Sequence, residues 1–171
     1  VINVDWADAN RYVAWLSRKT GKSYALPSEA QREYATRAGS RTPYWWGATI
    51  TLDQANYDLP IPSRLRPGDD REALAKVRRR TVPVDSFAAN PWGLFNVHGN
   101  VWEWTSDCFR RATAEIETAG ALVKQTVCGR RVSRGGSWND FAYLAASGAR
   151  IGFAAGSRNP TQGFRVVRQL P

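Results

Sequence analysis

The first regular pattern in the chain is a helical spacing of apolar residues close to its start. Apolar side chains recur there every three or four residues, which is the spacing of one helix face. That face would carry Trp6, Ala9, Val13 and Leu16. Asp5 stands where a helix N-cap is expected, and Gly21 stands where a helix commonly ends. The pattern therefore predicts an amphipathic helix over residues 6–19.

A second helix is predicted over residues 28–38. Ser28 and Gln31 have the spacing of a capping box, in which each side chain caps the backbone of the other residue. Gly39 would end the helix. We expect its inward face to carry Tyr34, Ala35 and Ala38.

The remaining pattern predicts loops and short strands. Frequent prolines mark residues 40–93 as mostly loop, with one short basic helix at 72–80. The second half has short apolar runs between turn residues, which is typical of strands. We expect strands at 101–105, 132–134, 149–153 and 164–168. Residues 112–125 would form an excursion between the two cysteines.

Length and composition fit one folded domain. The chain has 171 residues, of which 43% are hydrophobic, and it contains eight tryptophans and 14 glycines. Many aromatic side chains together with many glycines are typical of a fold with much irregular backbone. No apolar run approaches the ~20 residues that a membrane-spanning helix needs, so no membrane span is expected.

The charge of the chain is strongly positive, with a net value of +9. Apart from residues 78–80 and 110–111, the basic residues are scattered, and no nucleic-acid-binding pattern accompanies them. A solvated basic surface accounts for this charge, and binding to nucleic acid is not expected. The alternative is an anionic partner, such as a polyanionic glycan.

Cys108 and Cys128 are the two cysteines of the chain. A disulfide between them would close a loop of about 20 residues and stabilise the fold by about 3 kcal/mol in the chain-entropy model. The alternative is a pair of buried free thiols. A disulfide would favour an oxidising, extracytoplasmic compartment, whereas the spacing excludes a CxxC metal or redox motif.

Four segments, occurring in order, closely resemble the sulfatase-modifying-factor family, which is the family of the formylglycine-generating enzymes. They are residues 24–35 (YALPSEAQREYA), 91–105 (PWGLFNVHGNVWEWT), 131–138 (RVSRGGSW) and 163–165 (GFR). Residues 4–9 and 44–47 fit the same family.

The resemblance implies an irregular, loop-rich α+β fold of the C-type-lectin-like, formylglycine-generating-enzyme-like kind. Such a fold has two helices and short antiparallel strands. Family domains begin upstream of the position of Val1. We therefore expect a single domain over residues 1–171 that lacks its N-terminal part.

The resemblance also implies a structural calcium ion at the turn in the second segment. Its ligands would be the side chains of Asn96 and Glu103 and the backbone carbonyls of Gly99 and Val101. Hard cations such as Ca²⁺ prefer this mixture of amide, carboxylate and backbone oxygens. The alternative is a turn in which the Asn and Glu side chains only satisfy backbone groups.

A second, weaker calcium set implied by the family would use Asn56 and the carbonyl of Tyr57. His98 is the only histidine, and no cluster of cysteine or histidine accompanies it. A structural hydrogen-bonding role is therefore expected for His98, in place of a general base or a metal ligand.

The family's copper site is not expected in this chain. In formylglycine-generating enzymes, two cysteines five residues apart bind copper and mediate oxidation of a substrate cysteine. Counted back from Arg150, those positions hold Ala142 and Ser147. A Cu(I) ion needs thiolate ligands, which neither residue supplies. Formylglycine generation is therefore rejected.

The segment between RGGSW and GFR predicts a binding surface over residues 139–162. Aromatic side chains on a rigid support make good contact anchors. The predicted ligand-binding residues are Phe141, Tyr143, Ser147, Ile151, Phe153, Ser157, Asn159 and Thr161. For Phe141 and Phe153, a place in the core is the alternative. The same bracketed arrangement resembles the variable proteins of diversity-generating retroelements.

The main functional hypothesis is a non-catalytic module that binds a protein or glycan ligand. One alternative is the C-terminal domain of an enzyme, such as a sulfoxide synthase of thiohistidine biosynthesis or another oxidoreductase of the family. In a sulfoxide synthase, iron-binding histidines would lie in an upstream helical domain. A further alternative is an accessory module fused to a kinase, a protease or another signalling domain.

Overall fold

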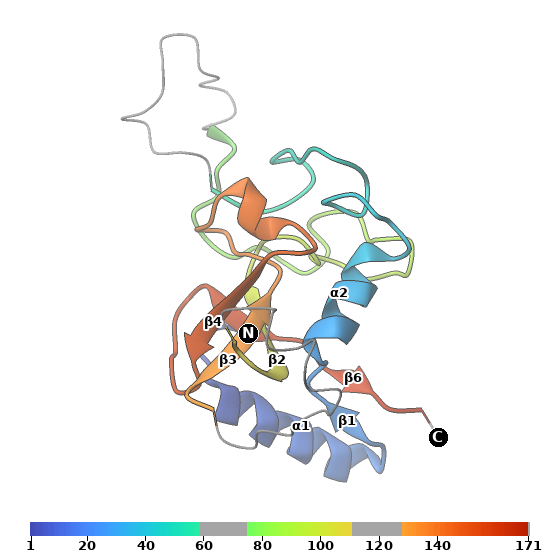
Figure 1. The fold of residues 1–171 in the computed structure, drawn as a ribbon, viewed down its shortest axis with the longest axis vertical. Helices are drawn as coiled ribbons and strands as arrows, with labels where there is room; N and C mark the ends of the chain where they lie inside the picture. The colour runs from blue at the N-terminus through green and yellow to red at the C-terminus, as the bar shows by residue number, and fades with distance from the viewer. Residues whose placement is uncertain (59–74, 111–127, 171) are drawn as a thin grey trace.

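The computed structural model describes residues 1–58, 75–110 and 128–170. Two α-helices, a four-stranded sheet and a two-stranded sheet make up the regular part of this region. Figure 1 shows helix α1 at one end of the molecule and most of the long loops at the other. None of the helices in the described ranges is long and apolar enough to cross a membrane. The predicted excursion 112–125 lies outside the described residues.

Helix α1 spans Trp6–Thr20 and confirms the first predicted helix. The side chain of Asp5 accepts a hydrogen bond from the backbone N–H of Asp8 at 2.7 Å. The Asp8 side chain accepts one from the backbone N–H of Asp5 at 3.1 Å, which completes a capping box. Gly21 ends the helix in the left-handed region, with φ at 66°.

Helix α2 spans Glu29–Arg37 and lies within the range predicted for the second helix. Its capping box is the predicted one. The backbone N–H of Gln31 donates to the Ser28 hydroxyl at 3.1 Å, and the backbone N–H of Ser28 donates to the Gln31 side chain at 2.8 Å. Each bond satisfies a backbone donor that the first helical turn leaves free.

The buried face of α2 differs from the predicted one. Tyr34 is 69% exposed and packs against Trp92, with their ring centroids 4.8 Å apart. Arg32 and Thr36 are buried in its place. The prediction for Tyr34 was wrong because the spacing of apolar residues does not reveal a buried arginine. A buried guanidinium group needs a carboxylate partner, and that partner comes from elsewhere in the chain.

The main sheet has the strand order β4-β3-β2-β5. Its strands are β2 (Trp102–Cys108), β3 (Arg130–Arg134), β4 (Arg150–Ala154) and β5 (Gln162–Phe164). The pairs β2–β3 and β3–β4 are antiparallel, as expected, whereas β2–β5 is parallel. The parallel pair arises because the chain, after β4, returns to the far side of β2 and enters β5 in the same direction as β2.

The strand predicted at 164–168 is divided between the two sheets. Its first residue ends β5, and strand β6 (Val167–Arg168) pairs with β1 (Tyr24–Ala25) in an antiparallel two-stranded sheet. This second sheet links the C-terminal segment to the connection between the two helices (Figure 1).

Strand β2 lies at the centre of the fold. Trp104 on this strand is fully buried, and its indole N–H donates to the carbonyl of Val4 at 3.0 Å. The buried residues Ala9, Val13 and Leu26 share a core cluster with Trp104. Burial of such apolar side chains stabilises the fold by about 1.5–3 kcal/mol each, so α1 is held to the sheet mainly by hydrophobic packing.

Of the short basic helix predicted at 72–80, the structure describes residues 75–80, in which Ala75 is helical and Lys76 lies in a turn. Residues 77–80 have no helical backbone. Val77 packs against the cluster of Leu52, Ala55 and Tyr57, and the Arg78 guanidinium donates to the Leu52 carbonyl at 2.9 Å. These tertiary contacts hold a non-helical segment whose apolar stripe is too weak to direct a helix.

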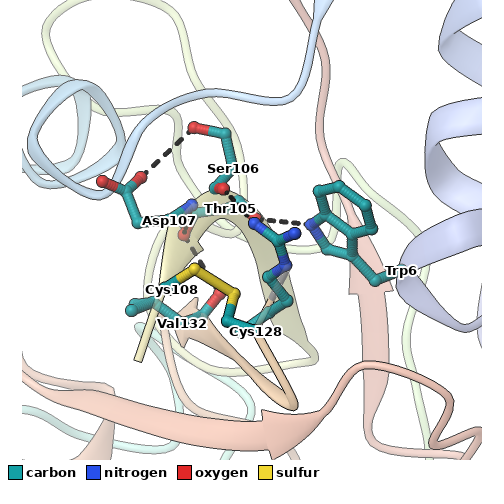
Figure 2. Close-up of a disulfide and its surroundings, with 8 residues drawn as sticks. Trp6, Thr105, Ser106, Asp107, Cys108, Cys128 and Val132 are labelled. Carbon is teal, nitrogen blue, oxygen red and sulfur yellow. Dashed lines mark hydrogen bonds between the residues drawn. A yellow bond between two sulfur atoms is a disulfide. The ribbon is translucent and has the colours of Figure 1, made fainter. Parts of the chain in front are cut away.

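The predicted disulfide is present. Cys108 ends strand β2, Cys128 precedes β3, and their Cα atoms are 5.8 Å apart. Figure 2 shows the bond beside Thr105, whose carbonyl accepts the Trp6 indole N–H at 2.9 Å. The bridge therefore closes the segment between two neighbouring strands next to the start of α1.

We predict that replacing both cysteines by serine lowers the free energy of unfolding by about 3 kcal/mol, since the bridge closes a loop of ~20 residues. Urea unfolding followed by tryptophan fluorescence measures the difference. Thiol counting on the unreduced, unfolded protein is the control and should find no free thiol. Two reactive thiols, or equal stability of the two proteins, would contradict the bridge.

Candidate functional site

The turn at residues 96–101 has the tight backbone that the sequence predicted. Asn96, Gly99 and Asn100 all have positive φ, at 49°, 73° and 70°. A side chain at Gly99 would place its Cβ atom 2.3 Å from the carbonyl oxygen of Asn56. The backbone N–H of Gly99 donates to the Gly135 carbonyl at 2.7 Å. Glycine is therefore required where three loops meet.

His98 has the structural role expected from the sequence. Its Nδ1 atom lies 2.7 Å from the carbonyl oxygen of Ala145, and its Nε2 atom accepts the backbone N–H of Trp45 at 3.2 Å. Burial lowers the pKa of His98 to about 4, so the imidazole is neutral at pH 7. Both ring nitrogens are in use, and the ring joins the turn to the 3-10 helix Ala142–Ala145.

Glu103 is the most tightly held charged residue near the turn. Its carboxylate is buried on β2 between the guanidinium groups of Arg32 and Arg165. Arg32 Nε lies 2.6 Å from Oε2, and Arg165 donates to Oε2 at 3.0 Å and to Oε1 at 2.9 Å. Burial alone would raise the pKa of Glu103, but the charges of Arg165 and Arg32 outweigh it and lower the pKa to about 2.

The carboxylate of the first predicted calcium set is occupied by arginine side chains. Both carboxylate oxygens of Glu103 are bound by guanidinium groups, whose positive charges would repel Ca²⁺. The Asn96 side-chain oxygen is buried without a hydrogen-bond partner, which does suit a ligand role. In the described ranges, no cluster of three His, Cys, Asp or Glu side chains could hold a metal ion.

The second predicted set is centred on Asn56, whose side-chain oxygen is also buried without a partner. Its amide nitrogen donates to the Arg80 carbonyl at 2.9 Å and to the Asn100 side chain at 3.1 Å. Tyr57 is buried in the neighbouring cluster. A calcium ion at this set stays a prediction.

Helix α2 contacts the sheet through a row of ion pairs that sequence reasoning missed. The Glu29 carboxylate lies 2.9 Å from Arg134 and 2.6 Å from Arg150. Glu33 lies 2.7 Å from Arg134 and 2.8 Å from Arg37. The available signal was the three- and four-residue spacing of charged residues on α2, which places them on one face.

The two positions of the family's copper-binding cysteines carry no thiol. Ala142 starts the 3-10 helix Ala142–Ala145, and Ser147 follows this helix closely. Ser147 is buried, and its hydroxyl has no hydrogen-bond partner. Its backbone N–H donates to the Pro43 carbonyl at 2.8 Å. Both cysteines of the chain are joined to each other in the disulfide.

The predicted ligand-binding residues differ in their exposure. Phe141 and Tyr143 are 38% and 67% exposed, and their ring centroids are 6.3 Å apart. Phe153 instead packs in the core, with its ring centroid 6.2 Å from those of Trp102 and Trp104. Phe153 thus packs against the core, which was the alternative for both residues, whereas Phe141 is exposed.

The other predicted contact residues lie on β4 or between β4 and β5. Ile151 is half-buried on β4. Ser157, Asn159 and Thr161 belong to the turn after β4, where the Asn159 side chain accepts the Thr161 hydroxyl at 2.7 Å. The Asn159 carbonyl also accepts the backbone N–H of Asn3, so this turn lies beside the N-terminal segment. Phe141 and Tyr143 precede β4, whereas Thr161 stands just before β5, where its carbonyl accepts the backbone N–H of Trp102.

A pocket of about 510 Å³ opens beside Tyr143. Its walls come from the end of α2, the segment 41–43 and the segment 143–150. Three arginines line it, namely Arg37, Arg41 and Arg150, and no acidic residue does so in the described part of the chain. The pocket has the size of small-molecule binding sites in proteins.

Comparison with known proteins identifies the family. A model of the sulfatase-modifying factor enzyme 1-like domain matches residues 1–170. The chain is 31% identical to the formylglycine-generating enzyme of Bos taurus, over 98% of this chain and 43% of that protein. It is 30% identical to the inactive C-alpha-formylglycine-generating enzyme 2 of Mus musculus, over 98% of this chain and 48% of that protein.

Solved structures show the same fold. PvdO from Pseudomonas aeruginosa matches with a TM-score of 0.79 and 32% identity, over 99% of this chain and 62% of that chain. Treponema denticola variable protein 1 matches with a TM-score of 0.73 and 23% identity, over 97% of this chain and 69% of that chain. This second likeness concerns the fold alone.

The chain therefore belongs to the sulfatase-modifying-factor family, as its four segments indicated. The expected α+β, formylglycine-generating-enzyme-like fold is confirmed. The chain spans about half the length of the curated relatives that it matches, with 43% and 48% for the two given above.

Proposed function

We propose that this domain is a non-catalytic binding module whose ligand contacts the exposed pair Phe141 and Tyr143 and the pocket beside it. The observation that carries the proposal is an exposed aromatic pair, of which Tyr143 lines the pocket, on a segment held from several sides. Large aromatic side chains lose little conformational freedom on binding and often supply most of the contact energy.

The support beneath this rim is rigid. The Tyr44 hydroxyl donates to the carbonyl of Ala142 at 2.9 Å, and the His98 ring contacts the carbonyl of Ala145. The backbone of Ser147 is bound to Pro43 on one side and to the Arg134 guanidinium, at 3.0 Å, on the other. A preorganised rim of this kind lowers the entropic cost of binding.

Chemistry of the formylglycine type is not part of the proposal. Ala142 and Ser147 cannot hold a copper ion through thiolates. One similar relative is itself named an inactive enzyme, which supports a non-catalytic branch. The alternative of a sulfoxide-synthase domain would need histidines from outside this chain, since His98 is already bound on both ring nitrogens.

Two finer points of the proposal concern origin and compartment. The likeness in fold to a variable protein supports diversification of the segment that carries Phe141 and Tyr143. A near-copy of the coding segment for residues 134–165 beside a reverse transcriptase gene would establish it. The disulfide favours an oxidising, extracytoplasmic compartment.

We predict that a ligand selected from glycan arrays and protein libraries loses at least about tenfold in affinity, or ~1.4 kcal/mol, when Tyr143 is replaced by alanine. Phe141→Ala should weaken it in the same direction. Tyr12→Ala is the matched control, because Tyr12 is also an exposed aromatic residue, at 44%, but lies on α1. A ligand that tolerates both rim changes and is lost with Tyr12→Ala would refute the proposed site.

A further inference from the structure

We propose that the pocket beside Tyr143 binds an oxyanion, meaning a carboxylate, phosphate or sulfate group, through Arg41 together with Arg37 and Arg150. This inference rests on the proposed function and names the chemical class of its ligand. Guanidinium groups offer paired N–H donors that match the oxygens of such groups.

Two of the three arginines are already oriented by the fold. Arg37 donates to Glu33 at 2.9 Å and to the Thr42 carbonyl at 3.2 Å. Arg150 donates to both oxygens of Glu29, at 2.6 and 2.8 Å. Their positions are thus fixed before a ligand arrives, which is the condition for preorganised binding.

Arg41 is the arginine with donors to spare. It is exposed and lines the pocket, and no described carboxylate pairs with it. The local charge balance also favours an anion. Including the neighbouring Arg134, four guanidinium groups are accompanied by three described carboxylates, Glu29 and Glu33 in ion pairs and Asp107 through its charge effect on Arg150.

The shape of the pocket leaves room for such a ligand. Gly148 lies in the wall, and a Cβ atom built there would lie 3.6 Å from an Arg37 Nη atom. The absence of a side chain at Gly148 therefore keeps this guanidinium group accessible. Tyr143, which is 67% exposed, adds an aromatic face for the non-ionic part of the ligand.

We predict that citrate, sulfate or phosphate raises the melting temperature of the domain above its value in chloride at the same ionic strength. Arg41→Gln should weaken binding about tenfold, the effect of losing one charged hydrogen-bond pair. Arg18→Gln is the matched control, because Arg18 is exposed on α1 and its loss changes the net charge equally. Citrate tests a carboxylate, and sulfate and phosphate test tetrahedral anions.

Equal anion effects in the native protein and in Arg41→Gln, or no anion effect at all, would overturn this inference. The proposed function fails separately. A neutral ligand whose binding depends on Tyr143 and not on Arg41 would support the binding function and contradict the oxyanion inference. A ligand whose binding depends on neither residue would contradict both.

We further infer, from a different observation, that Arg32 takes the place of a calcium ion at Glu103. The Arg32 guanidinium is 2% exposed, binds Glu103, and donates to the Val97 carbonyl at 3.1 Å and to the Thr36 hydroxyl. Arg165 donates to the Phe95 carbonyl at 2.9 Å. Two guanidinium groups thus neutralise the carboxylate and fix the loop carbonyls, the two tasks that an ion would perform.

Calcium should therefore give no rise in melting temperature that Asn96→Ala removes, whereas an ion held at this set at ~100 times its Kd would raise the melting temperature by several degrees. Arg32→Gln should lower the melting temperature and make it rise with added calcium. A calcium-dependent rise in the native protein that Asn96→Ala removes would overturn the inference. The calcium measurement on the native protein tests the inference even if Arg32→Gln fails to fold.

Discussion

The carboxylate of Glu103 is the point on which the arrangement of helix, sheet and loops depends. It stands at the start of β2 and is buried between Arg32 of α2 and Arg165, which follows β5. Removing one member of a buried ion pair costs about 3–5 kcal/mol, because the remaining charge stays buried without compensation. The cluster thus joins three segments that are far apart in the sequence.

Helix α2 is positioned by charge, whereas α1 is positioned by apolar packing. The buried apolar residues of α1 meet Trp104, while α2 presents Glu29, Arg32 and Glu33 to arginines and a glutamate of the sheet. Charged hydrogen bonds depend on orientation, whereas hydrophobic contacts do not. The ion pairs therefore set the rotation of α2 about its own axis relative to the sheet. The pocket wall at Arg37 follows from that rotation.

The sequence reveals the local features of this fold well. Asp5, Gly21 and Ser28 mark helix ends through capping interactions between near neighbours, and the structure confirms all three. The family resemblance correctly identified the fold and placed the turn around Gly99.

Long-range features could not be read from local patterns. Glu103 is separated from its two arginine partners by 71 and 62 residues, and no periodicity links them. The wrong prediction for Tyr34 follows from this missing contact. For Phe153 the sequence left a surface and a core position open, and only the pairing of β4 shows that it packs, half-buried, against the core cluster.

The site combines a scaffold of the formylglycine-generating-enzyme family with residues that cannot perform the family's copper chemistry. Ala142 and Ser147 lack thiols, both ring nitrogens of His98 make structural hydrogen bonds, and the charged groups that line the pocket in the described residues are all cationic. Such groups suit the ligand binding proposed for this domain. The chain thus has the fold of the family without the thiols of its copper site.

The most direct test is mass spectrometry of a cysteine-containing sulfatase peptide after incubation with the protein, copper and oxygen. A formylglycine-generating enzyme treated in parallel serves as the positive control. The account predicts that the peptide keeps its cysteine mass with this protein. A peptide carrying formylglycine would contradict it.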